Sequence, residues 1–311
     1  MPNDHVQHVS NADIRMALHL LAKGKATGND CLGDRLLHDL IKHNAVRQKI
    51  KCTFAEWLNG ARVPAYITTA RVIFLSKEQT PYPAEGNVRT IAILPAITKL
   101  YELVLHRKLI ACIKEHGLLH AHQRGFVEGG STLQNIHDVV RVIKYFQARQ
   151  QDLIHQKVPK HRRPEFFLLY LDLRKAFDSL NRDKLMLLLF QKTRNHTLTN
   201  AIRALYSNTC MTTQTHVLRQ NNSNTIKTER GVMQGGVLSP TLFALYINDL
   251  LIALNVHGIA AWALADDIVV ATIGQLHLMQ AIHKINTFCR EHSLTVNKKK
   301  SGIMVIRQDN R

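Results

Sequence analysis

Three aspartates interrupt or end apolar runs, and their placement constrains the fold more than any other feature of the sequence. Asp172 follows the run FFLLYL, and Asp266 and Asp267 divide the apolar stretch GIAAWALADDIVVATI. The first run is continuous, which is typical of a strand buried on both faces. The second is what a buried β-hairpin with an acidic turn would look like. We therefore expect an α+β fold in which helices back an antiparallel sheet.

Carboxylates in such surroundings need compensation, because burying an ionised group costs several kcal/mol. None of the immediate neighbours of Asp266 and Asp267 is basic, so a cation is the obvious compensation. Hard oxygen ligands favour Mg²⁺ or Mn²⁺, and a pair of such ions about 3.5–4 Å apart suits phosphoryl chemistry. An Asp-Asp dipeptide taken alone is more often an exposed turn. The apolar flanks favour the metal site.

The charge balance indicates a polyanionic partner. Lys and Arg number 41 against 23 Asp and Glu, which gives a formal net charge of +18. A surplus of this size favours nucleic acid, whose phosphates attract Lys and Arg. A generic basic protein, bound to a ribosome or an anionic membrane, has the same signature. Charge alone does not choose between them.

Cysteine usage and the first residues indicate the cellular environment. The five cysteines are scattered and form no CxxC pair, which argues against a disulfide framework and for a reducing compartment. No apolar run approaches membrane-spanning length, and the first residues resemble neither a signal peptide nor an organellar presequence. We expect a soluble intracellular protein that binds no membrane, with nucleus and mitochondrion both open.

Periodicity and breaker residues predict the remaining elements. A polar, basic surface loop is expected over residues 150–164, and a hairpin over 211–229 turning at 221–223. The other expected elements are a strand within 66–76, helices from Lys99 to Gly117, from Ser131 or Thr132, from Asp183, from Pro240 to Leu254 and over 276–291, and two final short strands.

Seven segments, in order, resemble the reverse transcriptases of non-LTR (LINE-type) retrotransposons. LYLDLRKAFDSL is similar to their motif A, GVMQGGVLSPTLFALYINDL to motif B, ALADDIVV to motif C and HSLTVNKKKSGIMVI to motif D. HAHQRGFVEGGSTLQNI resembles their QxGF segment. VIFLSKE with GNVRTIAILPAITKLYE resembles the fingers, and KGKATGND an N-terminal element. Each match is modest, and the order makes the set specific.

The resemblance implies a right-hand polymerase with fingers and palm. Residues 1–165 would form a fingers-like region that includes the QRGF segment and the basic loop, residues 166–306 the palm with motifs A to D, and residues 307–311 a short tail. No helical thumb follows the last expected strand, so a protein or RNA partner could supply it. A stand-alone organellar reverse-transcriptase-like protein is an alternative within the same resemblance.

The acidic residues receive roles from the resemblance. Asp172 would bind two metal ions and Asp266 would share them, whereas Asp267 would be a weaker ligand or a positioning group. The main-chain carbonyl of Leu173 would complete the metal site. Lys300, at the position of the motif D lysine, would protonate the leaving pyrophosphate, although a solvated run with Lys298 and Lys299 is the plain alternative.

Other positions would contact the nucleotide or the template. Phe177 would select deoxynucleotides, and Gln234 with Gly235 and Gly236 would let the backbone approach the template–nucleotide pair. A core phenylalanine and a simple glycine turn are the alternatives. The remaining candidates are Lys77 and Arg89 for the triphosphate, where surface basic residues are common, and Gln123, Arg124 and Gly125 for a template-contacting turn.

These observations predict an RNA-directed DNA polymerase that adds dNTPs to a DNA or RNA primer on an RNA template, with two Mg²⁺ ions or substituting Mn²⁺. Leu264 departs from the family's usual aromatic beside the acidic pair, and Thr90 from its proline after the fingers arginine. One alternative is a thumbless RNA-binding protein, maturase-like or ribosome-associated, with little or no synthesis. An RNA-dependent RNA polymerase is the other, and the bulky Phe177 opposes it.

Overall fold

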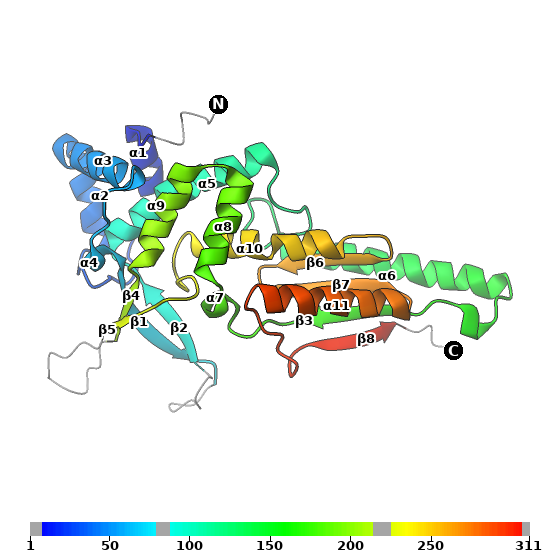
Figure 1. The fold of residues 1–311 in the computed structure, drawn as a ribbon. Coiled ribbons are helices and arrows are strands. Elements are labelled where there is room, and N and C mark those ends of the chain that lie inside the picture. The colour runs from blue at the N-terminus through cyan, green and yellow to red at the C-terminus, as the bar shows by residue number, and fades with distance from the viewer. Residues whose placement is uncertain (1–7, 79–87, 214–224, 307–311) are drawn as a thin grey trace. The chain divides into compact units, whose positions relative to one another are not determined.

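The computed structural model describes residues 8–78, 88–213 and 225–306 and divides into two compact units (Figure 1). Unit 1 comprises Met1–Leu118 and Arg182–Ser239, and unit 2 comprises Leu119–Asn181 and Pro240–Arg311. The units are thus interleaved in sequence, whereas the sequence predicted a single linear boundary after residue 165. The assignment of those linear regions to fingers and palm stays a prediction.

Helices make up most of unit 1, and α5 is its central element. Its helices are α1 (Asn11–Leu20), α2 (Asp34–Lys42), α3 (Asn44–Leu58), α4 (Ala65–Thr68), α5 (Ala96–His116), α8 (Arg182–Thr193) and α9 (His196–Ser207). α5 contacts α1, α8 and α9, and its side chains are buried on several sides. Tyr101 of α5 packs its ring 4.8 Å from Phe54 and 5.3 Å from Trp57. This aromatic cluster gives unit 1 a well-packed core.

The sheet of unit 1 has the strand order β2-β1-β4-β5. Its strands are β1 (Thr69–Ser76), β2 (Val88–Ile93), β4 (Cys210–Thr213) and β5 (Thr225–Lys227). β1 pairs antiparallel with β2 and parallel with β4, and β4 pairs antiparallel with β5. The predicted hairpin over 211–229 is therefore confirmed in its strands, and its predicted turn at 221–223 lies outside the described residues.

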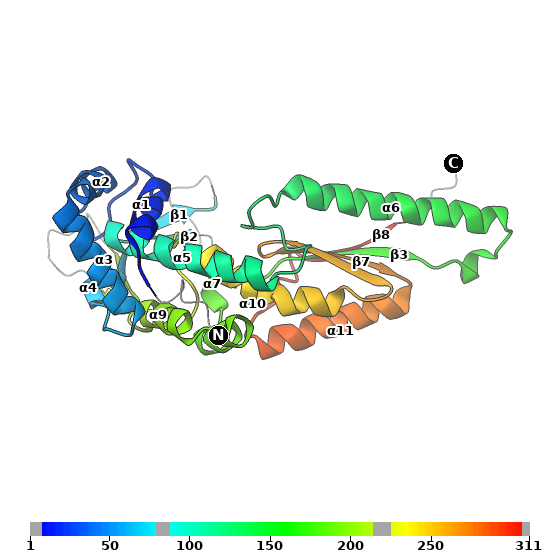
Figure 2. The same ribbon diagram turned by 90° about the horizontal axis from the view of Figure 1, so that it is seen from above.

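The sheet of unit 2 carries the acidic residues and has the order β6-β7-β3-β8, antiparallel throughout. Its strands are β3 (Phe166–Leu171), β6 (Ile259–Leu264), β7 (Asp267–Ile273) and β8 (Gly302–Ile306). One face is covered by α6 (Thr132–His155), and the other by α10 (Ser239–Leu254) and α11 (Gln275–Glu291) (Figure 2). The expected antiparallel sheet backed by helices is thus confirmed. The short α7 (Ala176–Ser179) follows β3.

The predicted loop over residues 150–164 is wrong in its first part, because α6 continues to His155. Gln150 is buried there and donates from Nε2 to the carbonyl oxygen of Pro164, at 2.6 Å. This contact across the end of the helix favours continued helix where composition alone predicted a loop. Only residues 156–164 leave the α-helix, and they include the 3₁₀ turn η2 (Lys160–Arg162).

Among the described helices, none is both long enough and apolar enough to span a lipid bilayer.

Candidate active site

The two strands of the acidic hairpin, β6 and β7, join through Ala265 and Asp266. Leu264 pairs with Asp267 across the hairpin, so the connection is a two-residue turn. Ala265 has a φ of +58°, in the left-handed region that glycine normally occupies. A turn of this hand suits the twist of a hairpin, and an alanine there costs about 1–2 kcal/mol. Non-glycine residues held in this conformation are concentrated at functional sites.

The pairing of β3 with β7 brings carboxylates from distant parts of the sequence together. Leu171 pairs with Ile268, so Asp172 and Asp267 lie at adjacent positions at the same end of the two strands. Both line one open pocket of about 340 Å³, to which Lys300 also contributes. Asp172 is half-buried, whereas Asp267 and Lys300 are exposed. Asp266 lies in the turn itself and is half-buried.

The oxygen atoms at this pocket are of the type that binds divalent cations. Two carboxylates on neighbouring strands supply hard oxygen atoms, which Mg²⁺ and Mn²⁺ prefer. Within residues 8–78, 88–213 and 225–306, no group of three or more His, Cys, Asp or Glu side chains is gathered as a metal site. Mg²⁺ commonly takes only one or two protein carboxylates and completes its shell with water and substrate phosphates, so two carboxylates are compatible with it.

The segment before β8 runs beside the end of β3. Leu173 forms an isolated antiparallel bridge with Val296. The backbone N–H of Arg174 donates to the carbonyl oxygen of Thr295 at 2.8 Å, and that of Asn297 donates to the carbonyl oxygen of Asp172 at 2.9 Å. The backbone around the catalytic candidate Asp172 is therefore fixed on the β8 side as well as the β7 side.

The QRGF segment packs against the acidic hairpin. Gln123 is buried, and its Oε1 accepts hydrogen bonds from the backbone N–H groups of Gly125 at 3.0 Å and Ala265 at 3.3 Å. A Cβ at Gly125 would lie 2.0 Å from the backbone nitrogen of Ala265, so only glycine fits. The observed contacts of this segment hold the turn that bears Asp266. Its predicted contact with template stays a prediction.

Phe177 is half-buried and stacks on Phe243 of α10, with ring centroids 4.7 Å apart. This is the contact expected if Phe177 helps to pack unit 2. A role in selecting the sugar stays a prediction. Leu264, at the position where the family usually has an aromatic, is half-buried beside the acidic turn.

In unit 1, the structure brings Lys77 and Arg89 to the same end of the β1–β2 pair. Leu75 pairs with Arg89, and Lys77 directly follows the last residue of β1. Both side chains are exposed. Their predicted role in binding a triphosphate stays a prediction, although a shared location on one hairpin is what that role requires.

The glycine loop of unit 1 approaches the protein's own backbone. The carbonyl oxygen of Gln234 accepts a hydrogen bond from the backbone N–H of Ala92 at 2.7 Å. Gly235 has a φ of +113°, and a Cβ there would lie 2.4 Å from the carbonyl oxygen of Ala92. The close approach that requires glycine is therefore explained by strand β2. The proposed approach of a template–nucleotide pair remains untested.

Sequence reasoning missed Glu102, which anchors the same loop. This side chain of α5 is 3% exposed, and its Oε2 accepts from the backbone N–H of Val237 at 2.6 Å. Burial raises the pKa of the Glu102 carboxyl to about 7, while the backbone N–H groups of Val237 and Leu238 act to lower it. The available signal was a lone carboxylate in the apolar helical stretch KLYELVL.

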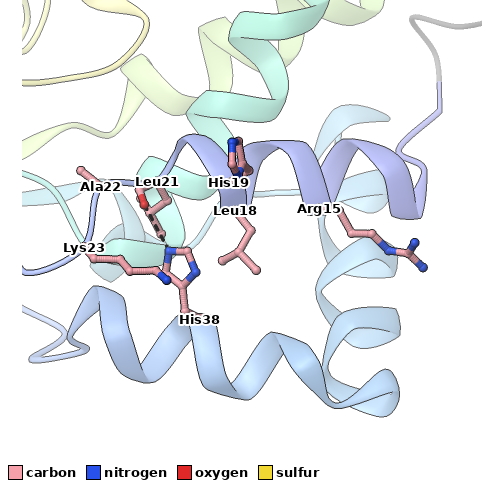
Figure 3. Close-up of a pocket in the computed structure, with 7 residues that line it drawn as sticks. All are labelled: Arg15, Leu18, His19, Leu21, Ala22, Lys23 and His38. Carbon is pink, nitrogen blue, oxygen red and sulfur yellow. Dashed lines mark hydrogen bonds between the residues drawn. The ribbon is translucent and has the colours of Figure 1, made fainter.

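A further pocket, in unit 1, lies between α1 and α2 (Figure 3). His38 reaches across from α2, and one of its ring nitrogens lies 3.1 Å from the carbonyl oxygen of Leu21. The wall is basic, and the residues lining it are Arg15, Leu18, His19, Leu21, Ala22, Lys23 and His38. It holds none of the predicted site residues.

Comparison with known families matches most of the chain. Residues 76–310 match the family described as "Reverse transcriptase (RNA-dependent DNA polymerase)". This range contains Asp172, Asp266, Asp267 and Lys300.

Curated relatives include polyproteins of retrotransposable elements. The chain is 25% identical over 272 residues to the Pol polyprotein of the type-1 element R2 from Nasonia vitripennis. It is 26% identical over 252 residues to the R2 polyprotein of Popillia japonica. These matches cover 85% and 77% of the chain but only 24% and 32% of the relatives. The chain thus spans a quarter to a third of the length of these proteins.

Solved structures with a similar fold include telomerases. A telomerase of Candida tropicalis in complex with a fragment of telomeric RNA aligns with a TM-score of 0.54 and 14% identity, covering 84% of this chain and 45% of that one. A truncated apo telomerase from the same organism gives 0.52 and 15%, covering 92% and 59%. The fold class is thereby supported independently of close sequence similarity. With residues 76–310 matched to that family and R2 polyproteins among its relatives, the chain belongs to the reverse transcriptases and contains a domain of the non-LTR retrotransposon type.

Proposed function

We propose that this chain is an RNA-directed DNA polymerase whose reactive centre is the pocket lined by Asp172, Asp267 and Lys300. The observation that carries the proposal is the β3–β7 register, which gathers these two carboxylates at one end of the sheet. In the reaction, the primer 3′-hydroxyl attacks the α-phosphate of a dNTP. The bond between the α- and β-phosphates breaks and pyrophosphate leaves.

Each acidic residue has a distinct part in this proposal. Asp172, Asp266 and Asp267, with the carbonyl oxygen of Leu173, would hold two divalent cations, Mg²⁺ or Mn²⁺. Such cations supply charge neutralisation for the attacking and leaving oxygens. Lys300, exposed in the same pocket, would donate a proton to the leaving pyrophosphate.

The remaining residues would bind and select the substrate. Phe177, braced by Phe243, would disfavour a 2′-hydroxyl and so select dNTPs. In unit 1, Lys77 and Arg89 would bind the triphosphate, and the backbone at Gln234 and Gly235 would support the nucleotide. The template is RNA, and the net charge of +18 favours binding of its phosphates.

Primer extension on an RNA template tests the proposal. Wild type, Asp172→Asn and Asp266→Asn would be compared in Mg²⁺ and in Mn²⁺, with Asp152→Asn as the matched control on the exposed surface of α6. We expect incorporation by the wild type and the control, and its loss in the two site variants. Equal incorporation by all four proteins would overturn the assigned chemistry.

An RNA-binding protein of the same fold with little synthesis is the second candidate, and Leu264 in place of an aromatic favours it. RNA binding that survives Asp172→Asn, together with no incorporation by the wild type, is the outcome that would select it. A separate comparison of dNTP with NTP use distinguishes a DNA polymerase from an RNA polymerase.

A further inference from the structure

The carboxylate of Asp172 is held by a side chain that lies far from it in sequence. Nδ2 of Asn297 donates a hydrogen bond to Oδ2 of Asp172 at 2.7 Å. This length is typical of a strong bond to an ionised carboxylate. It comes from the segment that precedes β8, and it fixes the side-chain rotamer of an otherwise half-exposed residue.

The same short turn also forms hydrogen bonds with both backbone groups of Asp172, its N–H and its carbonyl oxygen. The backbone N–H of Asn297 donates to the carbonyl oxygen of Asp172 at 2.9 Å, and the backbone N–H of Asp172 donates to Oγ of Ser301 at 3.0 Å. Main-chain and side-chain bonds therefore converge on a single residue.

The turn also sets the position of the candidate proton donor. The carbonyl oxygen of Asn297 accepts from the backbone N–H groups of Lys300 at 3.0 Å and Ser301 at 2.9 Å. Asn297 thus closes the turn that presents Lys300 to the pocket shared with Asp172 and Asp267.

The chemistry of the donor is suited to a cation ligand. An amide orients the carboxylate without adding positive charge, whereas a lysine or arginine in its place would compete with the cation for the anion. Groups that orient metal ligands in this way commonly affect metal affinity by about 10- to 100-fold when they are removed.

We propose that Asn297 is a positioning residue for Asp172, which orders its carboxylate so that Oδ1 is directed to a divalent cation. The proposal rests on the function proposed above. Asn297 touches neither substrate nor cation and acts through Asp172, with Ser301 fixing the backbone.

Mn²⁺ binding to the full chain, followed by the EPR signal of the free ion, tests the proposal without relying on activity. Asn297→Ala should weaken Mn²⁺ binding by about 10-fold or more. Asn297→Leu keeps the approximate size of the side chain, removes the donor and adds no charge, and it should weaken binding at least as much. Thr295→Ala, an exposed change in the same segment, should bind as wild type does.

Primer extension supplies the second readout. In Asn297→Ala, the Mg²⁺ concentration for half-maximal extension should rise by the same factor of about 10, with the KM for dNTP changed by less than about 3-fold. Suppose that the wild type is active and that a folded Asn297 variant keeps the wild-type Mn²⁺ affinity and Mg²⁺ dependence. This result would overturn the positioning role of Asn297 and leave the proposed function standing. A wild type that neither extends primers nor binds Mn²⁺ would overturn the proposed function, and this inference with it.

Discussion

Two carboxylates of this chain, Asp172 in unit 2 and Glu102 in unit 1, are both held by loops, and their surroundings differ sharply. Asp172 is half-exposed at a strand end and accepts from the side chain of Asn297. Glu102 is buried in a helix and accepts from the backbone of Val237. An accessible carboxylate remains available as a ligand, whereas the oxygen atoms of a buried one are occupied by hydrogen bonds to the loop that it anchors. Under the proposed function, similar hydrogen bonding would serve chemistry at Asp172 and architecture at Glu102.

The largest test of this contrast is catalytic. Asp172→Asn should lower dNTP incorporation by about 10³-fold or more, since in the proposed mechanism Asp172 is a cation ligand, and such a ligand contributes several kcal/mol to the stability of the transition state. Glu102→Gln keeps an oxygen acceptor for the loop and should leave incorporation within about 3-fold of wild type. Single-turnover extension measures both. Similar losses in the two variants would show that the distinction between ligand and anchor is wrong.

The pH dependence of stability is the next largest effect. The folded state raises the pKa of Glu102 from 4.5 to about 7, so it retains a proton that the unfolded chain has released. This contribution is fully present below pH 4.5 and is lost as the pH rises to about 7, an effect on the order of 3 kcal/mol. Urea unfolding of wild type and Glu102→Gln at pH 5 and pH 8 measures it. The free energy of unfolding of Glu102→Gln should not show this decrease between pH 5 and pH 8. An identical decrease in both proteins would mean that other titrating groups cause it.

The support of the acidic turn can be tested at Gly125. A methyl group there meets the backbone of Ala265, so Gly125→Ala should destabilise unit 2 by about 2 kcal/mol. Gly302→Ala adds the same group where nothing lies within 4 Å and should be neutral or stabilising. Thermal unfolding compares the two. Equal stability would mean that the turn shifts freely, and that Gln123 and Gly125 do not fix it.

Sugar selection is the smallest effect we predict. Phe177→Ala should reduce the preference for dNTP over NTP by about 10-fold, which corresponds to about 1.4 kcal/mol. Competition between labelled dGTP and GTP measures the preference. An unchanged preference would leave Phe177 with only its packing contact to Phe243.

Local patterns predicted the centre of unit 2 well. The strand β3, the hairpin β6–β7 and the start of α10 each have a sequence signal within a few residues, in apolar runs, an acidic turn or a proline. The end of α6 has no such signal, because Gln150 is tied to Pro164 by a contact that only the folded chain makes. Helix propensity is too weak to decide such a case alone.

The sequence predicted which residues line the candidate site, but not which residues hold them in place. Motifs predicted Asp172, Asp267 and Lys300, and the structure gathers these three at one pocket. The hydrogen bonds that Asn297 forms with Asp172 and Gln123 forms with Ala265 join segments more than one hundred residues apart. Local sequence periodicity carries no information about contacts at such distances. The interleaving of the two units was missed for the same reason.

The position of β3 in its sheet has a consequence for how the chain acquires its structure. Leu168 pairs with Ala271 on one side and with Met304 on the other, so both partners lie more than one hundred positions further along the chain. During synthesis, β3 must wait with two open edges and apolar side chains until its neighbours emerge. Such long-range pairing is slow and exposes strands to aggregation. We therefore expect nascent chains that end before β7 to need chaperones. We also expect the folding yield to depend on the rate at which the segment containing β7 and β8 is synthesised.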